Sequence, residues 1–144
     1  MTRNIVDLIN FKIRELQKNL LHLKQASFEV NKENLKEDII RYWGIERGIH
    51  ICVECVLDIA NIIISSLGLE RPDSYRETIL TLYKQGVIPE QFAKQIVGMA
   101  SFRNILVHDY TRVDEDIILD VLKNRLDDFA VFAQYITKWL EENH

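Results

Sequence analysis

Residues 48–67 read GIHICVECVLDIANIIISSL, and this stretch decides the fold class because it is apolar over most of its length. The polar exceptions within it are not scattered. At about 100° per residue they would share an arc of roughly 80° on a helix. This polar stripe consists of Arg47, His50, Glu54, Asp58, Asn61 and Ser65, with Trp43 in the same arc. The pattern predicts one long helix from about Lys32 to Leu67, ended by Gly68.

The polar stripe has two interpretations, and the sequence alone leaves both open. It is either the solvated face of an amphipathic helix or, because its flanks are also apolar, the lining of a cleft or a subunit interface. In the second case Arg47, His50, Glu54 and Asp58 are candidate cleft-lining residues. Either Arg47 with Glu54, or His50 with Glu54 four residues away, could then pair or position a catalytic group.

Helical spacing and capping residues predict four further helices around the long one. They run from about Asn4 to Gln25, from Asp73 or Ser74 to Tyr83, from Pro89 to near His108, and from Asp114 to about Leu140. The loops between them are short, and only two prolines and five glycines interrupt the chain. We therefore expect an all-α fold, an antiparallel up-and-down bundle of about five helices, that forms one domain over residues 1–144.

The composition argues against export and against a membrane location. Residues 1–10 mix charges with apolar residues and offer no small-residue cleavage site, so no export signal is expected. The most strongly apolar stretch, residues 59–67, contains Asn61 and is too short to span a bilayer. These features predict a cytoplasmic protein with no membrane partner.

The cysteines do not suggest a metal site. Cys52 and Cys55 form a single C-x-x-C pair, and no second pair completes a zinc site. No carboxylate cluster with clear metal-ligand spacing is visible near the candidate site described below. We interpret the two cysteines as small buried thiols, and we expect neither a metal nor another cofactor.

The net charge of −4 limits how this chain could hold a nucleic acid. Proteins that grip long nucleic acids by the backbone usually carry a surplus of basic residues. Any contact with RNA must therefore be local and confined to a cleft.

Polar residues are sparse between Ala93 and Val107, which makes the cluster at the end of the predicted fourth helix conspicuous. This cluster consists of Arg103, Asn104, His108, Asp109 and Tyr110. Asn104 and His108 are four residues apart and share a helical face. The long side chain of Arg103 can reach the same space.

This set of side chains suits RNA cleavage by the internal 2′-hydroxyl. Histidine titrates near neutrality, so His108 could take the 2′-hydroxyl proton or protonate the leaving 5′-oxygen. The planar cation of Arg103 matches a phosphate and the extra negative charge of its transition state. Asn104 could hold the imidazole or a phosphate oxygen. However, a lone histidine near a helix end is often a cap or an interior group, and Arg103 could simply pair with an acid, so these residues alone leave catalysis open.

The longer strings GVIPE at residues 86–90 and GMASFRNILVHDY at residues 98–110 closely resemble the HepT family of HEPN-domain proteins. The family motif is Arg-x4-His-x-Tyr, which Arg103, His108 and Tyr110 fill, with Asn104 as the polar residue expected after the arginine. The resemblance extends over essentially the whole chain in length and helix order.

This resemblance implies a toxin that cleaves RNA without a metal, with Arg103 and His108 as the catalytic pair. It also implies a homodimer in which two facing motif helices build one cleft. The implied partner is a minimal nucleotidyltransferase antitoxin, MntA, which transfers AMP from ATP to the motif tyrosine, here Tyr110. An AMP group there would put a bulky anion two residues from His108, where it would repel the RNA phosphate and block access.

Two other functions remain open at the level of the sequence. The chain could be a non-catalytic helical module that docks a nucleotidyltransferase and supplies it with a nucleotide or substrate, in which case the same residues would bind phosphate without breaking bonds. It could also be a purely structural dimerisation bundle, but that function leaves the polar cluster around His108 unexplained.

Overall fold

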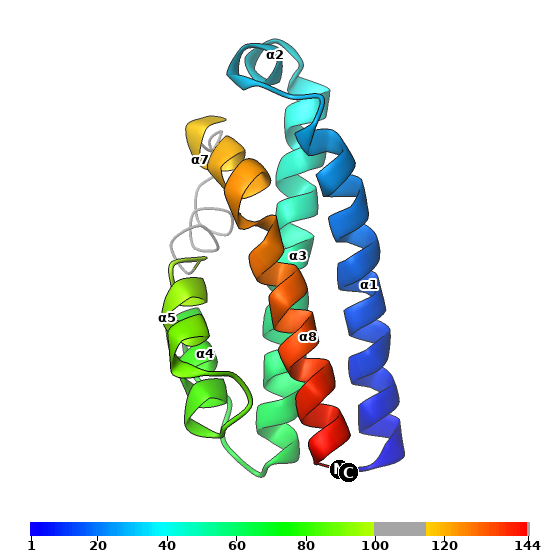
Figure 1. Cartoon of the computed structure of the whole chain (residues 1–144), viewed down its shortest axis with the longest axis vertical. Helices are drawn as coiled ribbons and strands as arrows, with labels where there is room; N and C mark the ends of the chain where they lie inside the picture. The colour runs from blue at the N-terminus through cyan, green and yellow to red at the C-terminus, as the bar shows by residue number, and fades with distance from the viewer. Residues whose placement is uncertain (100–114, 144) are drawn as a thin grey trace.

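The computed structural model describes residues 1–99 and 115–143, and every regular element in these ranges is helical. Three long helices lie side by side: α1 (Arg3–Ser27), α3 (Ile39–Ser66) and α8 (Leu126–Glu142). In Figure 1, α1 runs opposite to α3 and α8, and the two ends of the chain meet at the same end of the molecule. The predicted all-α helical bundle is confirmed.

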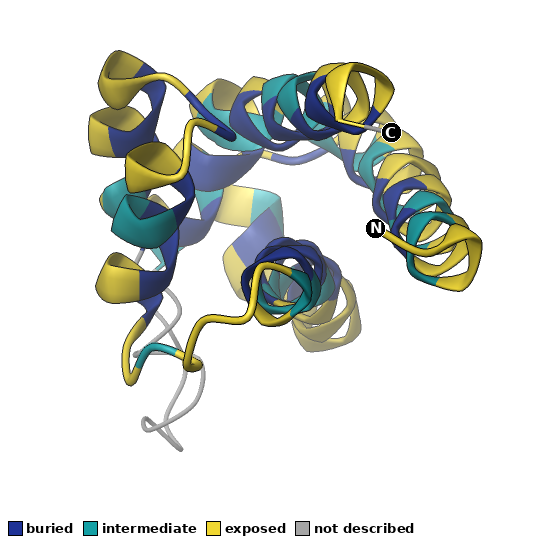
Figure 2. Ribbon diagram, turned by 90° about the horizontal axis from the view of Figure 1, so that it is seen from below, coloured by how far each residue is buried: buried dark blue, intermediate teal, exposed yellow. Residues whose placement is uncertain are grey.

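The shorter helices flank these three. Helices α4 (Tyr75–Lys84) and α5 (Glu90–Val97) pack on each other, and α4 also packs on α3. Helix α2 (Lys32–Glu37) lies at the opposite end of the bundle from the termini and packs against α7 (Glu115–Asp120). A π-helical turn, η1 (Val121–Arg125), joins α7 to α8. Most of the helices turn a buried side toward their neighbours and an exposed side outward (Figure 2).

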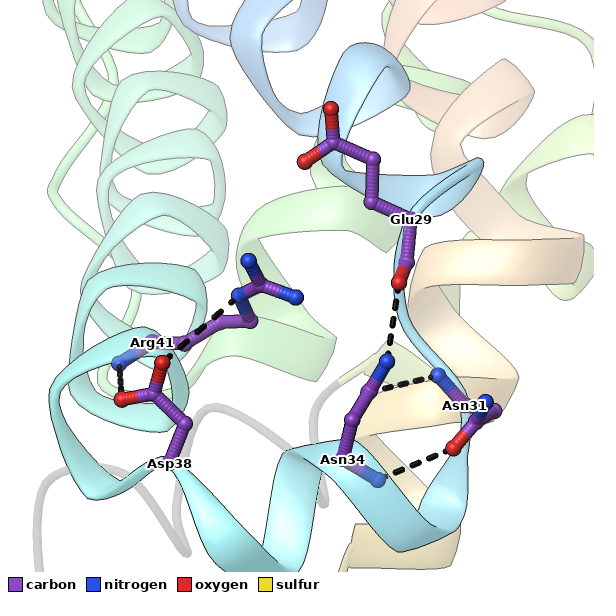
Figure 3. Close-up of polar contacts among 5 residues, drawn as sticks. All are labelled: Glu29, Asn31, Asn34, Asp38 and Arg41. Atoms are coloured by element: carbon purple, nitrogen blue, oxygen red, sulfur yellow. Dashed lines mark hydrogen bonds and ion pairs between the residues drawn. The ribbon is translucent and has the colours of Figure 1, made fainter.

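The prediction of one continuous helix from Lys32 to Leu67 is wrong, because the chain breaks at Asp38. The backbone of Asp38 is extended (φ −111°, ψ 93°), and its carboxylate accepts a hydrogen bond from the backbone N–H of Arg41, which caps α3. Helix α2 has its own cap, since the side chains of Asn31 and Asn34 each accept from the other's backbone N–H (Figure 3). Two caps so close together divide the segment into two helices.

The predicted ends of α3 and α4 are confirmed at Gly68 and Gly86, which both have φ +76°. After α3, Gly68 N–H donates to Ser65 O and Leu69 N–H donates to Ile64 O. The same pair of bonds follows α4 at Gly86. This pattern is a Schellman motif, which requires a left-handed residue that glycine adopts without strain. At the start of α4, Ser74 is the cap rather than Asp73.

The predicted fourth and fifth helices are only partly described. Pro89 is the N-cap of α5 rather than its first residue, and α5 ends at Val97, where Gly98 forms a turn. The remainder of the predicted fourth helix and the predicted cap Asp114 lie outside the described residues. The predicted fifth helix corresponds to α7, η1 and α8, so the expectation of one uniform α-helix is corrected by the π-helical turn.

The core is built mainly where α3 meets its neighbours, and α1 packs tightly on α3 at Gly48. A Cβ atom there would lie 2.8 Å from Leu23 Cδ2, so only a glycine lets α1 come this near without a shift. Asn19 fixes the contact by donating to Gly48 O at 2.6 Å. By length and composition alone, α3 passes the test for a helix that could cross a membrane. However, 61% of its most apolar window is buried inside the bundle, as in a core helix.

Candidate functional site

The residues predicted to perform the chemistry, Arg103, Asn104, His108 and Tyr110, lie outside the described residues. What the structure describes is how the chain reaches them. Helix α5 leads through Gly98 to Met99, which is buried, and the described chain resumes at α7. The structure does describe the side chains next to this point and the polar stripe of α3.

A buried carboxylate lies where the chain leaves α5. Asp128 of α8 is only 7% exposed, and its Oδ1 accepts a hydrogen bond from Gln95 Nε2 of α5 at 2.5 Å. Arg125 Nη1 lies 3.6 Å from Asp128 Oδ2, and Arg125 Nη2 lies 3.8 Å from where a Cβ of Gly98 would be. The Asp128 network (Asp128, Gln95 and Arg125) thus ties α8 and the π-helical turn to the end of α5.

Sequence reasoning missed the Asp128 network, although it contained one signal. Asp128 lies directly before Phe129, on the side of α8 that also carries Phe132, where an unpaired carboxylate would be costly. The same region holds Tyr75, whose hydroxyl donates to Ile96 O at 3.4 Å. Burial and the nearby Asp128 carboxylate raise the pKa of Tyr75 well above its usual range. Tyr75 therefore stays neutral and serves packing.

The polar stripe lies at least partly at the surface of the described chain, since none of its residues is fully buried. His50 Nε2 and Glu54 Oε1 lie 3.3 Å apart, and both side chains are only partly exposed. Asp58 faces α1, where Lys12 Nζ lies 3.3 Å from Asp58 Oδ2. The structure thus brings together His50 and Glu54, as their spacing suggested, and adds Lys12, which the stripe on a single helix could not reveal. Arg47 is exposed and has no ion-pair partner among the described residues.

At its C-terminal end the polar stripe opens into a hollow between α1 and α3. This α1–α3 hollow has a volume of about 650 Å³. Its polar lining consists of Lys12, Asp58, Asn61, Ser65, Ser66 and Arg71, and isoleucine and leucine side chains complete it. The side-chain oxygen of Asn61 is buried and makes no hydrogen bond.

The cysteines are buried thiols, as predicted. Both are free, and Asn19 Nδ2 lies 3.2 Å from Cys52 Sγ. Burial raises the pKa of the Cys52 thiol to about 12, and burial together with Asp58 raises the pKa of the Cys55 thiol. Over residues 1–99 and 115–143, no three His, Cys, Asp or Glu side chains gather as metal ligands would.

Comparison with known proteins identifies the family. The sequence model of the HepT-like family, described as "Ribonuclease HepT-like", matches residues 16–136, which include the whole Arg-x4-His-x-Tyr motif. The chain is 28% identical over 130 residues to the mRNA nuclease HepT of Shewanella oneidensis, covering 90% of this chain and 96% of that protein. It is 24% identical over 140 residues to the tRNA nuclease HepT of Aphanizomenon flos-aquae, covering 94% and 95% of the two chains.

The structural comparison agrees. The tri-AMPylated Shewanella oneidensis HEPN toxin, solved in complex with an MNT antitoxin, matches 96% of this chain and 99% of its own. The TM-score is 0.78 and the identity is 26%. Both the sequence model and the shape extend well beyond the motif, over most of the helical bundle. The chain therefore belongs to the HepT-like family of ribonucleases.

Proposed function

We propose that this chain is the toxin of a toxin–antitoxin pair and cleaves RNA without a metal, using Arg103, Asn104 and His108. The observation that carries the proposal is that the family match includes a complete Arg-x4-His-x-Tyr motif on a bundle of the same shape. The relatives named as mRNA and tRNA nucleases support RNA as the substrate.

The proposed reaction is transfer of the phosphodiester within the RNA. His108 takes the proton of the 2′-hydroxyl, the 2′-oxygen bonds to phosphorus, and the bond to the 5′-oxygen breaks. The leaving 5′-oxygen takes a proton from water, His108 then returns its own proton to the solvent, and the products are a 2′,3′-cyclic phosphate and a free 5′-hydroxyl. Arg103 stabilises the added negative charge at phosphorus, and Asn104 orients the imidazole or a phosphate oxygen.

The polar stripe is proposed as one wall of the cleft. Its support is the geometry of His50 and Glu54, which pair across one helical turn at the surface of α3 without being sealed in the core. Arg47, one turn from His50, is exposed and free to meet a phosphate. Asp58 is held by Lys12, so its charge is partly neutralised.

The proposed assembly is a homodimer that a nucleotidyltransferase antitoxin controls. A similar toxin has been solved with an MNT antitoxin and carries AMP groups, which supports AMP transfer to Tyr110 as the means of neutralisation. Tyr110 lies two residues from His108, so each AMP would place an anion beside the group that must meet the RNA backbone.

The test is incubation of purified protein with RNA in EDTA, comparing wild type with His108→Ala. We expect cleavage by wild type and a loss of about 100-fold or more in His108→Ala, since an acid–base group typically contributes that much. His22→Ala is the matched control, because His22 is exposed on α1, and it should cleave like wild type. Equal cleavage by wild type and His108→Ala would refute the role of His108.

The same experiment separates this function from the non-catalytic docking module. A docking module would leave RNA intact at every concentration, and its expression would not arrest growth. Growth arrest that disappears in Arg103→Ala supports the nuclease, because Arg103 acts on the transition state rather than on the fold.

A further inference from the structure

We propose that the α1–α3 hollow is a binding subsite for a nucleotide of the RNA substrate away from the cleaved bond. This inference rests on the proposed nuclease function and adds a second place where the substrate is held. It draws only on described residues of α1, α3 and the turn after α3. A hollow of about 650 Å³ is within the range of small-ligand sites, roughly 300–1,000 Å³.

The first argument is charge. The chain carries a net charge of −4, so RNA can be held only where cations are gathered locally. The hollow is lined by two cations, Lys12 and Arg71, and one carboxylate, Asp58, which gives it a net charge of +1. Lys12 is engaged with Asp58, whereas Arg71 has no ion-pair partner among the described residues. The guanidinium of Arg71 is therefore available to bind a phosphate in a bidentate manner.

The second argument is the unsatisfied amide of Asn61. Its side-chain oxygen is buried without a hydrogen bond, although buried polar groups in proteins are almost always paired. The protein itself covers this oxygen, but Asn61 as a whole is half-buried and lines the hollow, so its amide adds a polar group to the lining. Ser65, one turn further along, adds an exposed hydroxyl. An amide and hydroxyls beside apolar walls suit a nucleoside, which has both polar edges and apolar faces.

The third argument is position. Asp58, Asn61 and Ser65 belong to the same polar stripe as His50 and Glu54, so the hollow continues the proposed cleft wall along α3. His50 and Asn61 are eleven residues apart, which is about 16 Å along a helix. An RNA strand that follows this face would reach the hollow a few nucleotides from the stripe's middle.

The experiment measures binding separately from cleavage. A fluorescent oligonucleotide with 2′-O-methyl groups throughout lacks the nucleophile and stays intact, so its affinity can be read by anisotropy. Arg71→Gln takes the lining from +1 to neutral, and we expect about tenfold weaker binding. The dependence of log K on log salt should also become shallower by about 0.7, as for one lost phosphate contact on a single strand.

Asp58→Asn takes the net charge of the same lining from +1 to +2. We therefore expect tighter binding of the oligonucleotide, opposite to the effect of Arg71→Gln. Arg76→Gln is the matched control, because Arg76 is an exposed cation on α4 that does not line the hollow. It should bind like wild type. Asn61→Leu removes the amide from the lining, so it should weaken binding. It also removes a buried unpaired oxygen, so the midpoint of thermal unfolding should stay unchanged or rise.

The outcomes are distinguishable. If wild type neither binds this oligonucleotide nor cleaves the unmodified RNA, the proposed function fails. If wild type cleaves but Arg71→Gln, Asp58→Asn and Asn61→Leu all bind like the Arg76→Gln control, the function stands and the subsite is wrong. A change of sedimentation coefficient in Arg71→Gln would also overturn the subsite, because the hollow would then be a protein contact.

Discussion

At the scale of single residues, the ion pairs of α3 differ in how far apart their two members lie along the chain. His50 and Glu54 pair because residues four apart on a helix are neighbours whatever else surrounds them, whereas the sequence alone had left Arg47 as another partner for Glu54. Lys12 and Asp58 are 46 residues apart, and only the packing of α1 on α3 brings them together. Asp128 was missed for the same reason, since its partner Gln95 lies on another helix.

The Asp128 network yields a prediction about stability. Asp128→Ala removes the acceptor of Gln95 and the partner of Arg125 at a buried site, so the free energy of unfolding should fall by about 2–4 kcal/mol. Urea denaturation followed by circular dichroism measures this. Asp127→Ala is the matched control, because Asp127 is exposed, and it should change stability by less than about 0.5 kcal/mol. Similar losses in both variants would contradict the assigned role of Asp128.

Cys52 gives stability a dependence on alkaline pH. Its thiol pKa is 9.0 in the unfolded chain and about 12 in the folded one, because burial disfavours the thiolate. The folded state holds its proton longer, so this contribution is fully present below pH 9.0 and is lost as pH rises toward 12. We expect the unfolding free energies of wild type and Cys52→Ala to converge over this window. A constant difference between them would exclude the effect.

At the scale of elements, capping and glycine signals predicted helix ends well and helix interruptions poorly. Gly68 and Gly86 end α3 and α4 as expected, because a left-handed residue is a local requirement that the sequence displays. The break at Asp38 was not predicted, since Asp38 lies within a segment that otherwise reads as helix. The π-helical turn before α8 has no local signal of this kind, because it depends on how α8 packs.

Two glycines one turn apart in α3 should respond to alanine in opposite ways. A Cβ atom at Gly44 would have nothing within 4 Å, so Gly44→Ala should raise the unfolding free energy by about 0.5–1 kcal/mol. Gly48→Ala would place a Cβ atom 2.8 Å from Leu23 Cδ2 in the core. It should therefore lower stability, by about 1–3 kcal/mol relative to Gly44→Ala. Unfolding in guanidinium measures the free energy of unfolding of both variants. Equal free energies would contradict the predicted clash at Gly48.

At the scale of the whole molecule, composition predicted the fold class correctly, whereas a local cleft for RNA stays a prediction. Apolar residues at helical spacing, with few glycines and prolines, indicated a helical bundle, because such helices can bury their faces only against one another. The acidic net charge indicated that RNA must be held in a local cleft. That expectation fits a hollow whose cations, Lys12 and Arg71, come from different segments of the chain. No single stretch of sequence could display this combination.

The last prediction concerns the proposed homodimer. If two subunits build one cleft, the Arg103→Ala and His108→Ala variants should each be inactive as homodimers. A heterodimer of the two variants should be partly active. It keeps the histidine of one subunit and the arginine of the other. The two variants would be coexpressed with different affinity tags, purified through both tags and assayed on RNA in EDTA. The controls are the two homodimers, each made by coexpressing one variant with both tags and purifying it through both. If each chain instead held a complete site, both sites of the heterodimer would lack one catalytic group, and no cleavage above the controls would return.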